Sequence, residues 1–192
     1  MEAGALRASR AGRRRATALL IVGTSLRIFA VPLVMALVLS GSYSAAGIVF
    51  VAVSSTDWFD GRLARRWNVT TKLGSFLDTT ADKLLVTGAL VALVAVDRAS
   101  PWLAIVIIGR EFMLLGLRAV VASTGTHLEP STLGKWKTTV QFAAIALAMF
   151  RPDVTIAGAF LDEWALVLAA IVTVWSGVEY FARFSASLRA DT

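Results

Sequence analysis

Cysteine is absent from the 192-residue chain, and histidine occurs once, as His127. Without cysteine the protein has no disulfide, no thiolate metal site and no cysteine nucleophile. A general base elsewhere in the chain must therefore be a carboxylate, a lysine or a tyrosine. Charged residues are also scarce, at 17%, whereas 57% of the residues are hydrophobic and the mean hydropathy is +0.71. Because the apolar residues form long blocks, the composition predicts a polytopic membrane protein.

Six apolar segments follow one another without a long linker. We therefore expect one all-α domain of six transmembrane helices, covering residues 17–192. Before it, residues 1–16 form a basic N-terminal juxtamembrane segment that contains five arginines. The predicted spans are residues 17–39, 43–66, 75–97, 101–123, 134–150 and 161–183.

Lysine and arginine gather on one side of the predicted spans, whereas the other side carries only Arg98 and Arg151. The richer side is expected to be cytoplasmic, and an even number of spans then places both termini there. In a soluble protein the net charge of +6 would suggest nucleic acid. Here it is explained by span topology and anionic lipid headgroups, and no RNA- or DNA-binding motif is present. We therefore expect membrane lipid as a partner and no nucleic acid.

Four aspartates surround the junction between the second and third spans. Asp57 and Asp60 are three residues apart, and Asp78 and Asp82 are four apart. On helices each pair lies on one face, so two helices can direct four carboxylates at one point. A carboxylate near hydrocarbon costs about 2.5–3.5 kcal/mol, which favours neutralisation by bound cations. Oxygen ligands in this number suit Mg²⁺ or Mn²⁺, and the alternative is a set of capping and loop aspartates.

The spacing of these residues is also specific. It reads Asp57-x2-Asp60-Gly61-x2-Ala64-Arg65-x8-Gly74-x3-Asp78-x3-Asp82, and it resembles the signature of the CDP-alcohol phosphatidyltransferase family. The resemblance implies that family's fold and two divalent cations, Mg²⁺ or Mn²⁺. It also implies that the first three aspartates hold the metals, that Asp82 lies beside them as a fourth ligand, and that Asp82 is the catalytic base.

The same resemblance implies a pocket for the cytidine diphosphate group. From the residues alone, Arg65 could instead be an interfacial arginine, and the two glycines could serve close helix packing. The first span keeps a threonine and an arginine of the family pattern, but Ile21 stands where asparagine is usual. The implied CDP-binding residues are Asp60, Gly61, Arg65, Gly74, Thr24 and Arg27.

A second charged set follows in the fourth and fifth spans. Arg110 and Glu111 interrupt an apolar run, and an intramembrane ion pair is a hypothesis for a functional site. The alternative is an internal pair that locks two helices. Arg118 falls two turns after Arg110, while Lys135 and Lys137 open the fifth span, where the positive-inside rule alone could explain them. Together the four cations could bind a second anionic group, which favours a phosphorylated acceptor.

Arg110-Glu111-Phe112 and Gly134-Lys135-Trp136-Lys137-Thr138-Thr139 resemble motifs in one group of that family. Members of the group transfer a phosphatidyl group from CDP-diacylglycerol to sn-glycerol 3-phosphate in the bacterial cytoplasmic membrane, generally as homodimers. The resemblance thus implies a homodimer with a cytoplasmic active site. Inositol phosphate and phosphatidylglycerol remain alternative acceptors. A divalent-cation transporter is a further alternative, but the sequence shows neither broken helices nor paired repeats.

Overall fold

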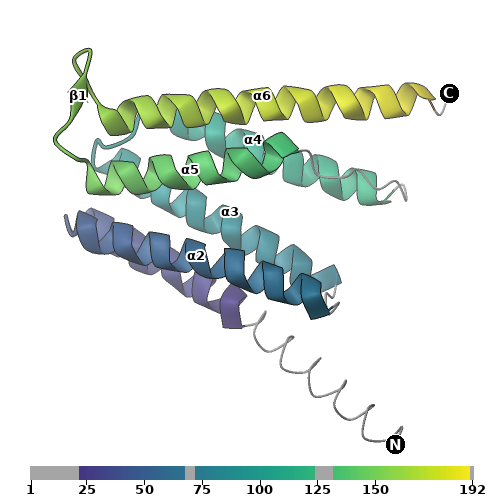
Figure 1. The fold of residues 1–192 in the computed structure, drawn as a ribbon, viewed down its shortest axis with the longest axis horizontal. Coiled ribbons are helices and arrows are strands. Elements are labelled where there is room, and N and C mark those ends of the chain that lie inside the picture. The colour runs from purple at the N-terminus through teal and green to yellow at the C-terminus, as the bar shows by residue number, and fades with distance from the viewer. Residues whose placement is uncertain (1–21, 68–71, 124–131, 191–192) are drawn as a thin grey trace, which may run out of the picture. The chain divides into compact units, whose positions relative to one another are not determined.

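The computed structural model describes residues 22–67, 72–123 and 132–190, and helices make up most of this part of the chain (Figure 1). Six described helices coincide with the six predicted segments to within a few residues, except that α6 continues further. The predicted start of the first segment, residues 17–21, lies outside the described residues. The elements are a first helix over Val22–Leu39, α2 Tyr43–Trp67, α3 Lys72–Ala95, α4 Pro101–Ser123, α5 Thr132–Phe150, β1 Thr155–Ile156, β2 Ala159–Phe160 and α6 Leu161–Ala190.

Two of the described helices are long and apolar enough to cross a membrane. They are the first helix, Val22–Leu39, and the Leu161–Ala182 part of α6. By contrast, α4 is long enough but carries Arg110, Glu111 and Arg118 along its length. The six helices are therefore confirmed, whereas six membrane crossings stay a prediction.

Local signals in the sequence explain where several helices begin and end. After the first helix, Gly41 has φ 80°, and the N–H groups of Gly41 and Ser42 donate to the carbonyls of Val38 and Leu37. This is the glycine-terminated Schellman ending. Asp97 ends α3 in the same way at φ 55°. Pro101 then opens α4, at a position where its missing N–H is harmless.

The chain divides into two compact units, Met1–Ala89 and Leu90–Thr192. In the first unit, the Val22–Leu39 helix packs closely on α3. A Cβ added to Gly88 would lie 2.7 Å from Cγ1 of Val31, so only glycine permits this approach. Fully buried apolar side chains fill the unit, among them Val34, Val38, Phe50 and Leu85.

In the second unit, α6 packs along α5 and α4, and a short β-hairpin connects α5 to α6 (Figure 1). The hairpin corrects the all-α expectation. Its two loop residues, Ala157 and Gly158, have φ 52° and 83°, as a type I′ turn requires. Trp164 donates from Nε1 to the carbonyl of Ile156 at 2.9 Å, which ties the hairpin to the first turn of α6.

Two arginines hold this end of the second unit together. Arg98 donates from Nη1 to the carbonyls of Ala148 and Met149, at 3.3 and 2.8 Å, and so caps the C-terminus of α5. Arg151 lies 3.5 Å from the carboxylate of the fully buried Asp162 and 3.1 Å from that of Glu163. The charge of Arg151 offsets part of the cost of burying the Asp162 carboxylate, whereas Glu163 is exposed.

Candidate active site

All four aspartates of the motif lie within helices. Asp57 and Asp60 are in α2, and Asp78 and Asp82 are in α3. The backbone therefore confirms that each pair shares one helix face. The side chains of Asp57, Asp60 and Asp78 lie outside the described part of the structure, and so do those of Gly61, Arg65 and Gly74. Among the described side chains, no three potential metal ligands come together.

Asp82 is the motif aspartate whose side chain is described. It lies in the first half of α3 with 18% of its side chain exposed, and its Oδ2 is 3.5 Å from Nζ of Lys83. The carboxylate is thus half-buried yet reachable. Such a group can exchange a proton with a bound substrate, and it can equally serve as an oxygen ligand.

Thr24 and Arg27, the further CDP-binding candidates, both lie on the buried face of the first helix. Arg27 is only 1% exposed. A buried guanidinium in an apolar helix is costly unless other groups compensate it, which marks the position as more than an interfacial anchor. The structure places these two residues in the first unit, together with the four aspartates.

In the second unit, the acceptor-binding candidates Arg110 and Lys137 meet at one carboxylate. Oε1 of Glu111 accepts hydrogen bonds from Nη1 of Arg110 at 3.3 Å and from Nζ of Lys137. It also accepts one from Nε2 of Gln141 at 3.3 Å. In the cluster formed by Arg110, Glu111 and Lys137, the side chains of Glu111 and Lys137 are 4% exposed, and that of Arg110 is 10% exposed. Two cations therefore share one buried anion.

Helix α6 contributes two hydroxyl groups that contact this cluster and Gln141. Nε2 of Gln141 also donates to Oγ1 of Thr173 at 2.8 Å, and Nη2 of Arg110 donates to Oγ of Ser176 at 2.6 Å. Thr173 and Ser176 are three residues apart, so both hydroxyls lie on the face of α6 that looks toward α4 and α5. The polar network thus joins three helices around Glu111.

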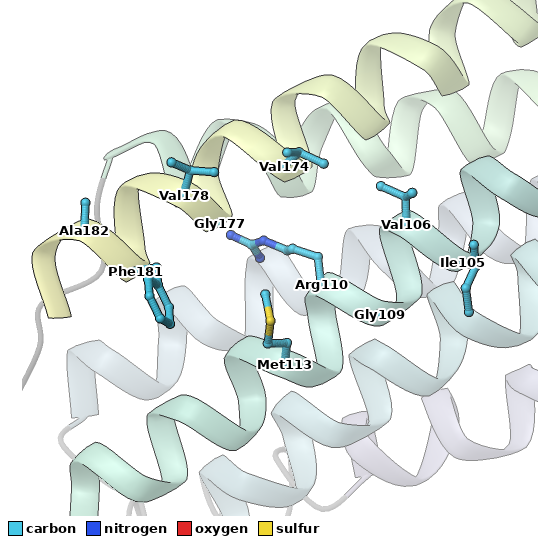
Figure 2. A pocket seen from close by; sticks show the side chains of 10 residues that line it. All are labelled: Ile105, Val106, Gly109, Arg110, Met113, Val174, Gly177, Val178, Phe181 and Ala182. Carbon is cyan, nitrogen blue, oxygen red and sulfur yellow. The ribbon is translucent and has the colours of Figure 1, made fainter. Parts of the chain in front are cut away.

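Arg110 also lines a groove between α4 and α6 with a volume of about 550 Å³ (Figure 2). Figure 2 shows its side chain reaching from α4 toward Gly177 on α6. A Cβ on Gly177 would lie 3.3 Å from Cγ of Arg110, so the glycine leaves room for the arginine stem. The other groove residues are mostly apolar: Ile105, Val106, Gly109, Met113, Val174, Val178, Phe181 and Ala182.

The remaining two acceptor-binding candidates have different positions. Arg118 lies two turns further along α4, with its guanidinium 5.4 Å from the ring centroid of Tyr180 on α6. This is a cation–π distance, and it fixes Arg118 on the same pair of helices as Arg110. The side chain of Lys135 lies outside the described residues. The structure therefore brings Arg110 and Lys137 together at Glu111, with Arg118 nearby in sequence on α4.

The sequence interpretation named Glu111 only as a partner of Arg110 and missed Gln141, Thr173 and Ser176. Each of these three is a buried polar residue in a largely apolar helix. A polar residue in an otherwise apolar helix predicts a hydrogen bond between helices, because such side chains usually bond to a neighbouring helix. The sequence alone does not say which helix receives the bond.

These features describe a helical protein with two helices that are apolar enough to cross a membrane and with charged side chains buried between its helices. The profile of the CDP-alcohol phosphatidyltransferase family matches residues 19–175. The chain belongs to this family, as its aspartate motif indicated.

Several curated proteins are similar to the chain over most of its length. A protein from Bacillus subtilis (strain 168) is 44% identical over 144 residues, which cover 74% of this chain and 74% of the relative. A protein from Escherichia coli (strain K12) is 39% identical over 173 residues, covering 86% of this chain and 93% of the relative. One from Shigella flexneri serotype 5b is 38% identical over the same lengths. All three are named CDP-diacylglycerol–glycerol-3-phosphate 3-phosphatidyltransferase.

Proposed function

We propose that the chain transfers the phosphatidyl group of CDP-diacylglycerol to sn-glycerol 3-phosphate, which yields phosphatidylglycerol phosphate and CMP in phospholipid biosynthesis. The observation that carries this conclusion is the name shared by relatives at 38–44% identity over most of the chain. The Arg110–Glu111–Lys137 cluster supports it, because two cationic side chains held close together suit an acceptor that carries a phosphate.

In the proposed reaction, a hydroxyl oxygen of glycerol 3-phosphate attacks the phosphorus that carries diacylglycerol. The bond from that phosphorus to the oxygen of CMP breaks, and CMP leaves with the bonding electrons. The hydroxyl proton passes to Asp82, whose half-buried carboxylate makes it the candidate base. Because the nucleophile comes from the substrate, no covalent enzyme intermediate is needed.

Asp57, Asp60 and Asp78, with Asp82 beside them, would hold two Mg²⁺ or Mn²⁺ ions. Their fit rests on the donor chemistry and on the helices, since α2 and α3 each present a pair of carboxylates on one face. When bound, the ions would supply positive charge that offsets the negative charge developing on the reacting phosphate.

The CDP group would be held in the first unit. Asp60, Gly61, Arg65 and Gly74 belong to the family motif, and their positions in α2 and α3 put them within a few turns of the metal ligands. Thr24 and Arg27 are proposed to complete this pocket from the first helix, where both are buried. The guanidiniums of Arg65 and Arg27 suit a pyrophosphate, which they can bind with paired N–H groups.

The acceptor phosphate would be bound by Arg110, Arg118, Lys135 and Lys137.

We further propose six membrane crossings, with both termini and the active site at the cytoplasmic surface. We also propose a homodimer as the assembled form. The excess of lysine and arginine on one side of the spans supports the orientation. Light scattering of the purified protein in detergent would measure the dimer.

The test is an assay of CMP release by the purified protein with CDP-diacylglycerol and a panel of acceptors. The panel contains glycerol 3-phosphate, inositol phosphate, serine and phosphatidylglycerol, each with Mg²⁺ and with EDTA. We expect CMP release with glycerol 3-phosphate and Mg²⁺ only. Faster turnover of another alcohol would reject the acceptor, and full activity in EDTA would reject the metals.

A further inference from the structure

We propose that Glu111 is a positioning residue for the acceptor phosphate, and that Gln141 and Thr173 in turn hold Glu111 in place. The inference rests on the proposed function, because it assigns a task to the residues around the two phosphate-binding cations. Glu111 itself does not touch the substrate. It sets the positions of the Arg110 guanidinium and the Lys137 ammonium group.

The first argument is convergence on one atom. Arg110, Lys137 and Gln141 all donate to the same oxygen, Oε1 of Glu111, and they come from two helices. Arginine and lysine have long side chains with many rotamers, and fixing them costs conformational entropy. Because a shared buried acceptor already fixes both side chains in the free protein, fewer side chains lose conformational entropy when a phosphate binds.

The second argument is charge. Within the cluster two cations face one carboxylate, and both Lys137 and Glu111 are almost fully buried. A neutral ion pair would be sufficient to lock two helices. The second cation at the same carboxylate adds N–H donors close by, and charge-assisted hydrogen bonds from such donors suit a phosphate dianion. Arg110 also lines the groove of Figure 2, so the cluster reaches open space on that side.

The third argument is that α6 supports the carboxylate only indirectly. Thr173 accepts a hydrogen bond from Gln141 at 2.8 Å, and the same amide nitrogen donates to Glu111. Neither Thr173 nor Gln141 carries charge, so their contribution is geometrical. A change at Thr173 can therefore disturb the position of Glu111 without changing the charge of the site.

The experiment measures the KM of each substrate separately in the full-length protein purified in detergent. Glu111→Gln keeps the size of the side chain and one acceptor oxygen but removes the negative charge, so Arg110 and Lys137 lose the anion that they share. We expect the KM for glycerol 3-phosphate to rise about tenfold or more, while the KM for CDP-diacylglycerol stays within about twofold. Glu111→Asp restores the charge with a shorter reach and should fall between wild type and Glu111→Gln.

Thr173→Val and Thr173→Ser form the matched pair that decides the question if Glu111→Gln does not fold. Valine removes the hydroxyl at nearly constant volume, and we expect about a threefold rise in the KM for glycerol 3-phosphate. Serine keeps the hydroxyl and should behave as wild type. A second readout is the increase in melting temperature on addition of glycerol 3-phosphate alone, which should be reduced in Thr173→Val.

Three results would overturn the inference: equal changes in both KM values, a lower KM for glycerol 3-phosphate, or a lower melting temperature with both KM values unchanged. Each would mean that the network only holds the helices together. Failure of the proposed function looks different, because the wild-type protein would then not release CMP with glycerol 3-phosphate at all.

Discussion

Among single residues, Asp82 combines two proposed tasks, metal ligand and catalytic base, in one half-buried carboxylate beside Lys83. The two tasks make different demands. A carboxylate that holds a dication tightly is a weak base, so the base role requires a loose metal contact. Substitution separates the tasks, because an amide can still offer one oxygen to a metal but cannot accept the proton.

Asp82→Asn is therefore expected to lower kcat by about 10²–10⁴-fold, the usual contribution of a general base, and added Mg²⁺ should not restore it. CMP release at increasing Mg²⁺ concentrations measures this. Asp97→Asn is the control, because Asp97 lies in an exposed loop with φ 55°, which asparagine tolerates. Recovery of Asp82→Asn at high Mg²⁺ would make Asp82 a ligand only.

For the other motif aspartates the expectation concerns the metal directly. Asp57→Asn and Asp78→Asn remove a charged oxygen from α2 and from α3, respectively. Each should abolish Mg²⁺-dependent CMP release from CDP-diacylglycerol, since two dications need several carboxylates to bind. Normal turnover in either variant would contradict the metal site.

The basic residues should act on the acceptor alone. Arg110→Ala and Lys135→Ala each remove one charge-assisted hydrogen bond, typically about 1.5–3 kcal/mol, so the KM for glycerol 3-phosphate should rise roughly 10–100-fold. The KM for CDP-diacylglycerol should change less. Arg189→Ala, near the C-terminal end of α6, is the control for a general loss of positive charge. Equal rises in both KM values would speak against an acceptor pocket.

For the helices, close packing depends on small residues at defined places. Gly88 of α3 faces Val31 and Met35 of the first helix, and an added Cβ would lie 2.7 Å from Val31 and 3.3 Å from Met35. The Val31 contact is the closer one, and its short branched side chain has few rotamers with which to move away. The same helix contains Asp78 and Asp82, so a shift of α3 would also disturb the proposed metal ligands.

Gly88→Ala should therefore destabilise the protein by about 1–3 kcal/mol, as overpacking of a close contact does. Gly116→Ala in α4 is the matched control, because nothing lies within 4 Å of its added Cβ. That change should stabilise the helix by about 0.5–1 kcal/mol. Unfolding midpoints in detergent compare the two variants, and equal midpoints would contradict the packing argument.

For the whole molecule, the chain's lack of cysteine makes its orientation easy to measure. Single cysteines at Ser42, Ser100 and Asp153 would lie in the connections predicted outside the cytoplasm. We expect a membrane-impermeant thiol reagent to label all three from outside intact cells. Ser123→Cys, at the cytoplasmic end of α4, should react only after the cells are opened. Labelling of Ser123→Cys from outside would reject the proposed topology.

Helix positions were largely predictable from the sequence because long apolar segments must satisfy their backbone groups internally. The aspartate pairs were predictable for a related reason, since spacings of three and four residues correspond to one helix face. Gln141, Thr173 and Ser176 were not identified, because their significance depends on which helices pack together. The β-hairpin was missed as well, because a two-residue turn at Ala157 and Gly158 leaves almost no pattern in the sequence.

The sequence by itself determined the helical class, the family and the pairing of the four aspartates along two helices, since these follow from composition and from spacing along one chain. Only the tertiary structure decided that Arg110, Lys137 and Gln141 meet at one oxygen of Glu111, with Thr173 and Ser176 behind them. The physical reason is that residues more than 20 positions apart come into contact through helix packing. Packing depends on many weak contacts at once, which no single motif encodes.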